Sequence, residues 1–228
     1  MPHLIEVKNA SKIYHPGENE VRALDRVSLT VDAGEFVAIV GRSGSGKSTL
    51  MNLLGCLDGC AAGEYRLDGR EVSRMRDDEL SDIRGRWIGF VFQGFNLIPG
   101  MTALENVELP LRYRGMGREE RKELALAALE RVGLRERTDH RPAQLSGGQQ
   151  QRVAIARAIA AAPPILLADE PTGNLDRRSG EEVMAIIRGL WREGRTVILI
   201  THDPKIAETA QRVVTILDGR IIGDKSNG

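Results

Sequence analysis

Short apolar runs bounded by turn residues recur along the chain, and segments with helical spacing lie between several of them. Strand-like runs are predicted over residues 5–8, 21–31, 36–40, 64–67, 87–92, 165–169, 196–200 and 213–217. Helical patterns are predicted over residues 47–57, 77–84, 118–132, 146–160 and 177–193, with a short helix after Pro204. Strands that alternate with helices are typical of an α/β fold with a mainly parallel sheet.

The pattern changes between Gly94 and about Leu145, where strand-like runs disappear and helical spacing takes over. In this stretch Thr102, followed by Glu105, has the spacing of a helix N-cap with a capping box. We therefore predict one domain over residues 1–228, with a helical subdomain inserted at about residues 94–160. A small antiparallel β subdomain is expected near the N-terminus, and residues 224–228 are expected to form a loose tail.

A glycine-rich loop follows the apolar run 36–40 and reads G-R-S-G-S-G-K-S-T. Glycines allow the backbone to curl so that several N–H groups point at one anion, and the following helix adds its positive end. Lysine and serine at the end of such a loop suit the β- and γ-phosphates and Mg²⁺, respectively. The alternative is a surface turn, against which the strand-to-helix context argues. The residues are Gly41, Arg42, Ser43, Gly44, Ser45, Gly46, Lys47, Ser48 and Thr49.

Two carboxylates end the apolar strand predicted over residues 165–169. Side chains alternate along a strand, so Asp169 and Glu170 are expected to point in different directions. Asp169 can then reach a metal ion while Glu170 faces an attacking water, which suits phosphate hydrolysis. The alternative is that these acids only cap the next helix. With the phosphate loop, this strand predicts a P-loop NTPase core.

Charge and apolar content narrow the class of protein. Lys and Arg number 32, as do Asp and Glu, so there is no basic excess to favour nucleic acid. No apolar run approaches the ~20 residues that span a bilayer, and the first residues do not resemble a signal peptide. We therefore expect a cytoplasmic protein. Cys56 and Cys60 are expected on one face of the helix after the phosphate loop, as core filling more than as a metal or redox pair.

A second unusual element reads L-S-G-G-Q-Q-Q-R and begins at Leu145. Ser146 stands at a predicted helix start, and Gly147 and Gly148 follow it, so this element can form a second anion-binding helix terminus. Taken alone, Ser-Gly-Gly could also be an ordinary cap with a flexible entry.

The motifs together resemble the ATP-binding cassette (ABC) ATPase family. They are the phosphate loop, Gln93, the octapeptide that begins at Leu145, the strand ending in Asp169 and Glu170, and His202, in the family's order. The resemblance covers nearly the whole chain, and the octapeptide is specific to the family. It implies that Ser146, Gly147, Gly148 and Gln149 contact the ATP of a second copy, so that two ATPs lie between two head-to-tail chains.

Further roles follow from the resemblance alone. Tyr14 is expected to stack on adenine, Gln93 to contact Mg²⁺ or water, and His202 to bind the γ-phosphate. The loop Asn174-Leu175-Asp176 is expected to couple the two sites of the dimer. Catalysis is assigned to Glu170, His202, Gln93 and Lys47, and the metal to Ser48, Gln93 and Asp169. For Tyr14, Gln93, the loop and His202, ordinary structural roles are the alternatives.

A cassette without a membrane span is expected to act on something else. The segment from Phe95 to Val107 is apolar for a loop entry, and in the family this region receives a helix of the membrane permease. Packing within the helical subdomain is the alternative. The segments F-V-F-Q-G-F-N-L-I-P and D-E-P-T-G-N-L-D are similar in sequence to those of the family branch that serves macrolide export and lipoprotein release. The related cell-division ATPase, which activates cell-wall hydrolases, is the alternative.

Other classes fit the sequence less well. A kinase or GTPase would share the phosphate loop but would not need the octapeptide, and no guanine motif is present. A chromosome or DNA-repair ATPase would need coiled-coil arms, and a ribosome-acting cassette protein normally carries two cassettes. A binding module with a dead site is disfavoured because Lys47, Asp169, Glu170 and His202 are all present.

Overall fold

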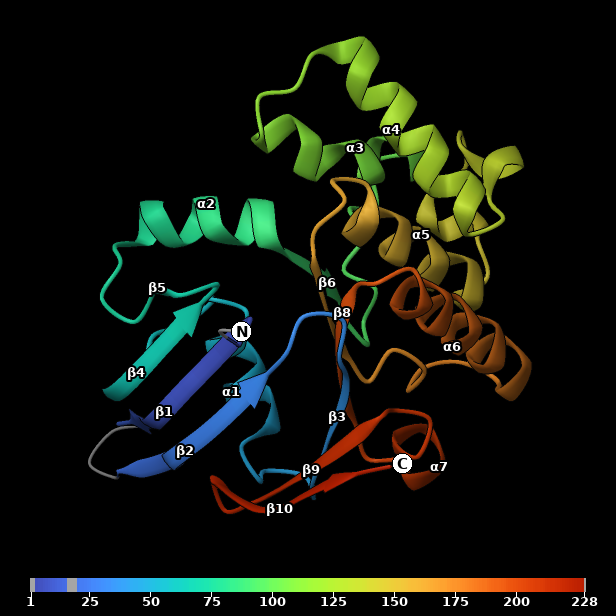
Figure 1. Ribbon diagram of the computed structural model, residues 1–228. Helices are drawn as coiled ribbons and strands as arrows, with labels where there is room; N and C mark the ends of the chain where they lie inside the picture. The colour runs from blue at the N-terminus through green and yellow to red at the C-terminus, as the bar shows by residue number, and fades with distance from the viewer. Residues whose placement is uncertain (1–2, 16–19, 228) are drawn as a thin grey trace. The chain divides into compact units, whose positions relative to one another are not determined.

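The structure is a computed structural model that describes residues 3–15 and 20–227 (Figure 1). It divides into two compact units, of which the first comprises Met1–Arg84 and Thr196–Gly228. The second unit comprises Gly85–Arg195. Each unit is described by itself, and helix α2 (Asp77–Trp87) runs through the division in the sequence.

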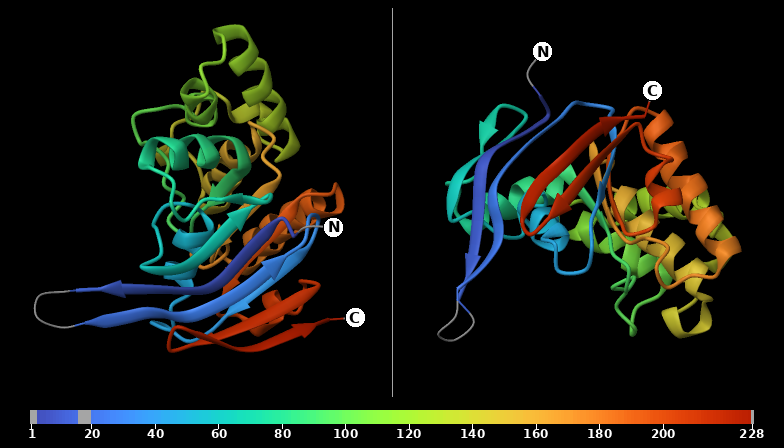
Figure 2. Two further views of the ribbon diagram at one scale, coloured as in Figure 1. Left: turned by 60° about the vertical axis from the view of Figure 1, so that its left-hand side comes forward. Right: turned by 90° about the horizontal axis from the view of Figure 1, so that it is seen from below.

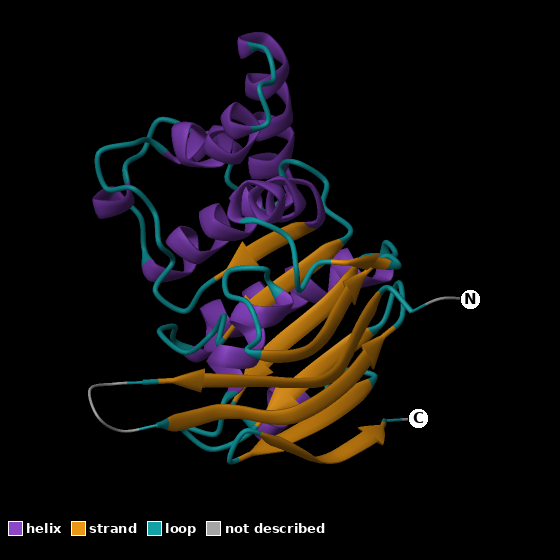
Figure 3. Ribbon diagram, turned by 90° about the vertical axis from the view of Figure 1, so that its left-hand side faces the viewer, coloured by secondary structure: helices purple, strands orange, loops and turns teal. Residues whose placement is uncertain are grey.

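An antiparallel sheet forms one part of the first unit. Its strands are β1 (Ile5–Tyr14), β2 (Val21–Val31), β4 (Ala62–Leu67) and β5 (Arg70–Glu71), in the order β2-β1-β4-β5. Ile5 of β1 pairs with Val31 on one side and Leu67 on the other, and all three side chains are buried. The predicted N-terminal antiparallel subdomain is therefore present (Figure 3).

The rest of the first unit surrounds the buried strand β3 (Phe36–Val40), which leads into helix α1 (Lys47–Leu54). β3 lies between β8 (Thr196–Thr201) and β9 (Arg212–Leu217) and runs parallel to both. β10 (Arg220–Ser226) forms an antiparallel hairpin with β9, and the short helix α7 (Pro204–Ala207) follows β8. Figure 2 shows this hairpin in red. The carboxyl ends of β3 and β8 thus lie side by side.

The second unit contains a parallel strand pair and most of the helices. Strand β6 (Ile88–Val91) pairs in parallel with β7 (Ile165–Asp169). Helices α3 (Ala103–Tyr113), α4 (Arg118–Arg131) and α5 (Gly147–Ile159) pack against one another, and α6 (Arg177–Arg192) packs on α5. Two single turns of 3₁₀ helix, Arg135–Arg137 and Pro142–Gln144, join α4 to α5.

Local capping explains where two of these helices begin. The Thr102 side chain accepts a hydrogen bond from the Glu105 N–H, and Glu105 Oε2 accepts one from the Thr102 N–H, so the predicted capping box is confirmed. Ser146 caps α5 in the same reciprocal way with Gln149. Both helix starts were visible in the sequence because the capping pattern is local.

Three details of the sequence prediction are wrong. Helix α1 ends at Leu54 with Gly55 as its C-cap, so Cys56 and Cys60 do not share a face of that helix. Cys56 is buried and has a positive φ of 53°, a conformation that a helix excludes. Residues 224–226, expected in a loose tail, belong to β10, where the Asp224 carboxylate accepts a hydrogen bond from the Arg212 side chain of β9. Trp87, expected in a strand, ends α2.

None of the helices described over residues 3–15 and 20–227 is long and apolar enough to cross a membrane.

Candidate functional site

The glycine loop between β3 and α1 has the shape of an anion cradle. Gly44 and Gly46 have positive φ values of 76° and 103°, which side-chain-bearing residues rarely adopt. A Cβ added to Gly41 would lie 2.4 Å from the Ile216 carbonyl oxygen, and one added to Gly46 would lie 2.5 Å from that of Ala23. The glycines are therefore required by close backbone packing as well as by conformation.

Lys47 lies folded over this loop. Its Nζ donates hydrogen bonds of 2.8 Å to the carbonyl oxygens of Gly41 and Arg42, and the residue is only 8% exposed. These acceptors are neutral, and an anionic phosphate oxygen is a stronger acceptor for an ammonium group. The lysine is thus already held at the place where a phosphate would need it.

The loop contains a buried hydroxyl without a hydrogen-bond partner among the described residues and a helix start without a side-chain cap. The Ser45 Oγ is buried and has no hydrogen-bond partner among the described residues. The N-cap of α1 is Gly46, which provides no side-chain cap for the N–H groups of the first turn. Unsatisfied donors at a helix start fit an anion, so the residues present suit a nucleotide phosphate.

The metal donors predicted from the sequence are spread over several elements. Ser48 is exposed at the start of α1, while Gln93 and Asp169 follow or end strands of the second unit. Within residues 3–15 and 20–227, no group of three or more His, Cys, Asp or Glu side chains could by itself hold a metal ion. A few oxygen donors suit Mg²⁺, which usually keeps several waters and takes phosphate oxygens as ligands.

Tyr14 is fixed by two neighbours in the first unit. Its hydroxyl donates a 2.9 Å hydrogen bond to Asp58 Oδ2, and Lys12 Nζ lies 5.2 Å from the centre of its ring. Burial and then Asp58 raise the pKa of Tyr14, while the Thr49 hydroxyl lowers it, so Tyr14 lies within reach of the phosphate loop. Tyr14 is 37% exposed as a residue, which leaves surface for stacking.

His202 lies at the same edge of the sheet as the phosphate loop. Thr201, the last residue of β8, pairs with Val40, the last residue of β3. His202 is exposed at the next position, and Asp203 then caps α7 by accepting from the Lys205 N–H. His202 thus follows the strand that pairs with the one leading into the phosphate loop.

Gln93 and Glu170 lie at matching positions in the second unit. Val91 of β6 pairs with Ala168 of β7, and Gln93 and Glu170 each lie two residues beyond this pair along the chain. Glu170 has a positive φ of 42° directly after Asp169, the last residue of β7, so the regular strand conformation ends there. Both acids make contacts within the protein.

Gln93 is also tied to the loop after β7, which sequence reasoning missed. Gln93 Nε2 donates to Asn174 Oδ1 at 3.2 Å, and Asn174 Nδ2 donates to the Gln93 carbonyl at 3.0 Å. A Cβ at Gly173 would lie 2.7 Å from Gln93 Nε2, so the two segments are in close contact. The pair joins a predicted sensor residue to a predicted coupling loop.

The start of α5 lies against the start of α6. A Cβ on Gly148 would lie 2.7 Å from Ser179 Oγ, which itself donates a 2.7 Å hydrogen bond to Asp176, the N-cap of α6. Gly147 has more room, since its nearest neighbour would be Leu175 at 3.6 Å. Ser146 is exposed. The octapeptide therefore presents an accessible helix end.

Two further residues of α5 hold the loops that follow β6 and β7. Gln151 is fully buried, and its Nε2 donates to the carbonyls of Phe92 at 3.3 Å and Pro171 at 2.8 Å. Arg157 donates to the carbonyls of Phe95 and Asn96, two consecutive residues with positive φ. Burial lowers the pKa of Arg157. A polar residue on the inward face of a helix was the sequence signal that could have found both.

The predicted docking segment from Phe95 to Val107 is partly exposed and partly packed. Ile98 is 38% exposed and Leu97 is half-buried, whereas Val107 is fully buried. Buried Asn106 fixes the turn, because its side chain bonds the Ile98 N–H and three backbone carbonyls in this segment. The segment therefore combines internal packing with an accessible apolar turn.

Comparison with known proteins decides the family. Residues 24–173 match the family described as ABC transporter. The chain belongs to the ABC transporter family. The family predicted from the sequence is therefore confirmed.

ABC relatives match this chain over nearly its whole length. It is 53% identical over 225 residues to a macrolide export ATP-binding/permease protein MacB 1/2 of Paracoccus denitrificans, covering 99% of this chain and 34% of that protein. MacB of Chlorobaculum tepidum is 55% identical over 97% of this chain and 34% of its own length. The chain thus spans about a third of these relatives. An uncharacterised ABC transporter ATP-binding protein of Bacillus subtilis, YvrO, is 51% identical over 97% of both chains.

Solved ABC structures share the fold. A dimeric, post-hydrolysis state of the ATP-binding cassette MJ0796, bound to ADP and Pi, has a TM-score of 0.91 and 47% identity over 98% of this chain and 99% of that chain. A second dimeric MJ0796 structure, described as a bacterial ABC transporter cassette, has a TM-score of 0.91 and 48% identity. The predicted α/β cassette fold is confirmed.

Proposed function

We propose that this chain is the ATP-hydrolysing, nucleotide-binding subunit of an ABC transporter. The observation that carries the proposal is the phosphate loop. It offers an uncapped helix start, a buried Lys47 and an unpaired Ser45 hydroxyl to an anion. Family membership gives the class of anion, because relatives of this chain are named as ATP-binding proteins.

The local chemistry is divided among a few side chains. Lys47 neutralises charge on the β- and γ-phosphates, and His202 contacts the γ-phosphate. Glu170 accepts a proton from the attacking water, while Gln93 orients that water and senses the γ-phosphate. Ser48, Gln93 and Asp169 would hold Mg²⁺, which would supply further positive charge to the phosphates. Adenine and phosphate contacts are assigned to Tyr14, Gly41, Arg42, Ser43, Gly44, Ser45, Gly46, Lys47, Ser48 and Thr49.

A second copy of the chain completes each site in this proposal. Ser146, Gly147, Gly148 and Gln149 of one copy contact the γ-phosphate held by the other, in a head-to-tail dimer that closes with ATP. The exposure of Ser146 and the room beside Gly147 support this, and the MJ0796 cassettes are dimeric. Closing such a dimer almost completely requires about 5.5 kcal/mol of differential binding. Hydrolysis and phosphate release remove that contribution.

Transport across the membrane is assigned to a permease that docks near the segment from Phe95 to Val107. The exposed turn at Ile98 supports this site, and the Gln93–Asn174 pair provides a route from it to the nucleotide. The subunit then acts at the inner face of the cell membrane, in the cytoplasm. Substitution of Ile98 by Glu should abolish transport in the assembled complex but leave basal ATPase activity within about twofold. Normal transport in that variant would contradict the docking site.

The cargo class is a macrolide-like compound, a peptide or a lipoprotein, exported or extracted by a mechanotransmission-type mechanism. Relatives at 53% and 55% identity are named for macrolide export, which favours export over the cell-division alternative. No residue of this chain is assigned to cargo recognition, which belongs to the permease.

The direct test is steady-state phosphate release by the purified chain with Mg²⁺ and ATP. Glu170→Gln should lower the turnover by about 10²-fold or more while leaving nucleotide affinity near that of the wild type. Removal of Mg²⁺ with EDTA should stop hydrolysis. A wild-type chain that releases no phosphate above background, alone or with its permease, would contradict the proposal.

A further inference from the structure

The turn between β9 and β10 forms one wall of the phosphate loop. The Gly219 N–H in this turn donates a 2.9 Å hydrogen bond to the Ser45 carbonyl. A Cβ on Gly46 would lie 3.3 Å from Gly219 Cα, and one on Gly41 would lie 2.4 Å from the Ile216 carbonyl oxygen. The backbone of the loop therefore rests directly on the hairpin.

Strand β2 holds the same turn from the other side. The Asp25 N–H donates a 2.9 Å hydrogen bond to the Gly219 carbonyl, and a Cβ on Gly219 would lie 2.8 Å from the Ala23 carbonyl oxygen. A continuous chain of backbone hydrogen bonds thus runs from Asp25 through Gly219 to Ser45. Each link depends on the position of the turn.

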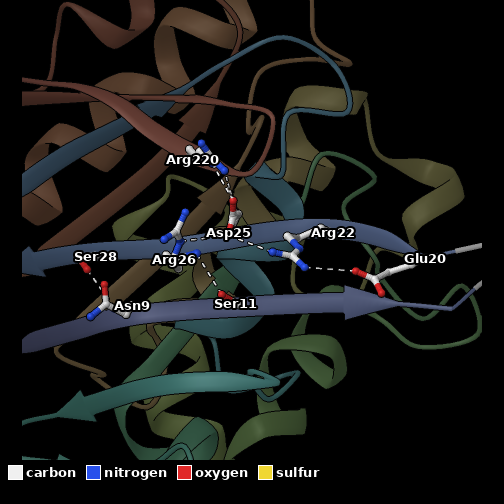
Figure 4. A network of polar contacts seen from close by, with 8 residues as sticks. All are labelled: Asn9, Ser11, Glu20, Arg22, Asp25, Arg26, Ser28 and Arg220. Atoms are coloured by element: carbon white, nitrogen blue, oxygen red, sulfur yellow. Dashed lines mark hydrogen bonds and ion pairs between the residues drawn. The ribbon is translucent and has the colours of Figure 1, made fainter.

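A single ion pair closes this arrangement. The Asp25 side chain is only 7% exposed, and Arg220, the first residue of β10, donates from Nε to Asp25 Oδ2 at 2.7 Å (Figure 4). Arg220 Nη2 also contacts that oxygen. The pair joins β2 to the hairpin directly beside Gly219, where the backbone links run.

Two other arginines contact the Asp25 carboxylate, but they lie on the same strand as Asp25 and so do not join β2 to the hairpin. Arg22 and Arg26 lie on β2 with Asp25, and their contacts with Asp25 Oδ1 are both 3.5 Å long. Figure 4 shows both on the strand that carries Asp25. They supply matched controls, because each places a guanidinium near Asp25 but neither reaches the hairpin in this network.

We propose that Asp25 and Arg220 are positioning residues that hold the β9–β10 turn against Ser45 and so preset the phosphate loop for ATP. The inference rests on the proposed nucleotide binding and extends it to two residues outside the motifs. Without the ion pair, the turn can move away and the Ser45 carbonyl loses its donor. The loop amides must then be ordered when the phosphates bind, and that ordering lowers affinity.

The test compares Arg220→Met with Arg26→Met in the full chain. Isothermal titration calorimetry with Mg-ADP gives affinity, and steady-state assays give KM for ATP and kcat at a temperature at which all variants are folded. Arg220→Met should weaken ADP binding and raise KM about five- to tenfold, with kcat changed less than twofold. Arg26→Met should stay within about twofold of the wild type in ADP affinity, KM and kcat.

Further variants keep the result interpretable. Arg220→Lys retains the charge and should recover part of the affinity, whereas Asp25→Asn should behave like Arg220→Met and serves if that variant does not fold. The double variant should bind ADP no more weakly than either single variant, because both changes break one interaction.

Two outcomes would overturn the inference. One is a lowered melting temperature for Arg220→Met with ADP affinity and KM unchanged, which would assign the pair to stability alone. The other is an equal loss of affinity in Arg26→Met, which would reflect net charge. A wild-type chain that binds no ADP would instead refute the proposed function and this inference with it.

Discussion

Helices α1 and α5 both begin within glycine-containing motifs, but their N-termini are capped differently. The N-cap of α1 is Gly46, which has no side chain, and the buried Ser45 Oγ nearby has no hydrogen-bond partner among the described residues. The N-cap of α5 is Ser146, whose hydroxyl accepts from Gln149 N while Gln149 closes the capping box. The start of α1 has no side-chain cap, whereas the start of α5 is capped by its own chain at the Ser146 and Gln149 N–H groups.

The difference in capping suggests different roles for the two helix starts: α1 binds the nucleotide, and α5 recognises a nucleotide that is already bound. An uncapped helix start with a buried lysine is preorganised for an anion, so we expect the phosphate loop to bind ATP in a single chain. A capped start gains less from an anion of its own. We therefore expect α5 to act only when a second copy presents ATP already held by its phosphate loop.

The largest expected effect comes from Lys47. Lys47→Met removes the positive charge that lies over the loop carbonyls and should lower ATPase turnover by about 10²- to 10³-fold. Nucleotide affinity of the single chain should fall as well, which equilibrium binding of Mg-ADP can measure. Unchanged affinity for Mg-ADP would contradict the comparison, because it would show that nucleotide binding at the start of α1 does not depend on Lys47.

A smaller effect is expected from the pair in the second unit. Asn174→Ala removes both hydrogen bonds to Gln93 and should lower kcat about three- to tenfold while nucleotide affinity stays near that of the wild type. A double-mutant cycle with Gln93→Ala measures the coupling between the two side chains. Strict additivity of the two changes would show that the contact does not serve turnover.

The smallest effect is expected on stability. Ser146→Ala removes the cap of α5 and should lower the free energy of unfolding by about 1 kcal/mol in urea titrations. Thr102→Ala is the matched control, because Thr102 caps α3 with the same capping box outside the proposed nucleotide contacts. If only Ser146→Ala impairs ATP-dependent association, the hydroxyl serves the partner's nucleotide as well as the helix.

Local signals predicted much of the fold. The bounds of β2, β3 and β7 agree with the apolar runs, and the caps at Thr102 and Ser146 follow from residues three apart. Prediction was wrong where tertiary contacts decide the structure. Residues 224–226 are polar, and their strand depends on pairing with β9, including the ion pair of Asp224 with Arg212.

The candidate site was predictable by motif but not by its supports. The spacing of the glycine loop, the strand acids and the octapeptide identified the family, which the comparisons confirmed. The Gln93–Asn174 and Asp25–Arg220 pairs join residues far apart in the chain, so no local pattern marks them. Individual roles within the site stay predictions.

The most direct measurement of the central claim is the ATP-dependent association of Glu170→Gln chains that differ only at Gly147. Gly147 has room for a side chain, so Ala should be tolerated there, whereas Asp places a negative charge where the partner's phosphates are proposed to lie. Analytical ultracentrifugation with saturating Mg-ATP reports association, and equilibrium binding reports nucleotide affinity.

The account predicts that Glu170→Gln and Glu170→Gln/Gly147→Ala form dimers with ATP. It predicts that Glu170→Gln/Gly147→Asp stays monomeric but binds ATP with the affinity expected of a single chain. Dimers of the Asp variant, or loss of its ATP affinity without any change in fold, would contradict the assignment of α5 to the partner's nucleotide.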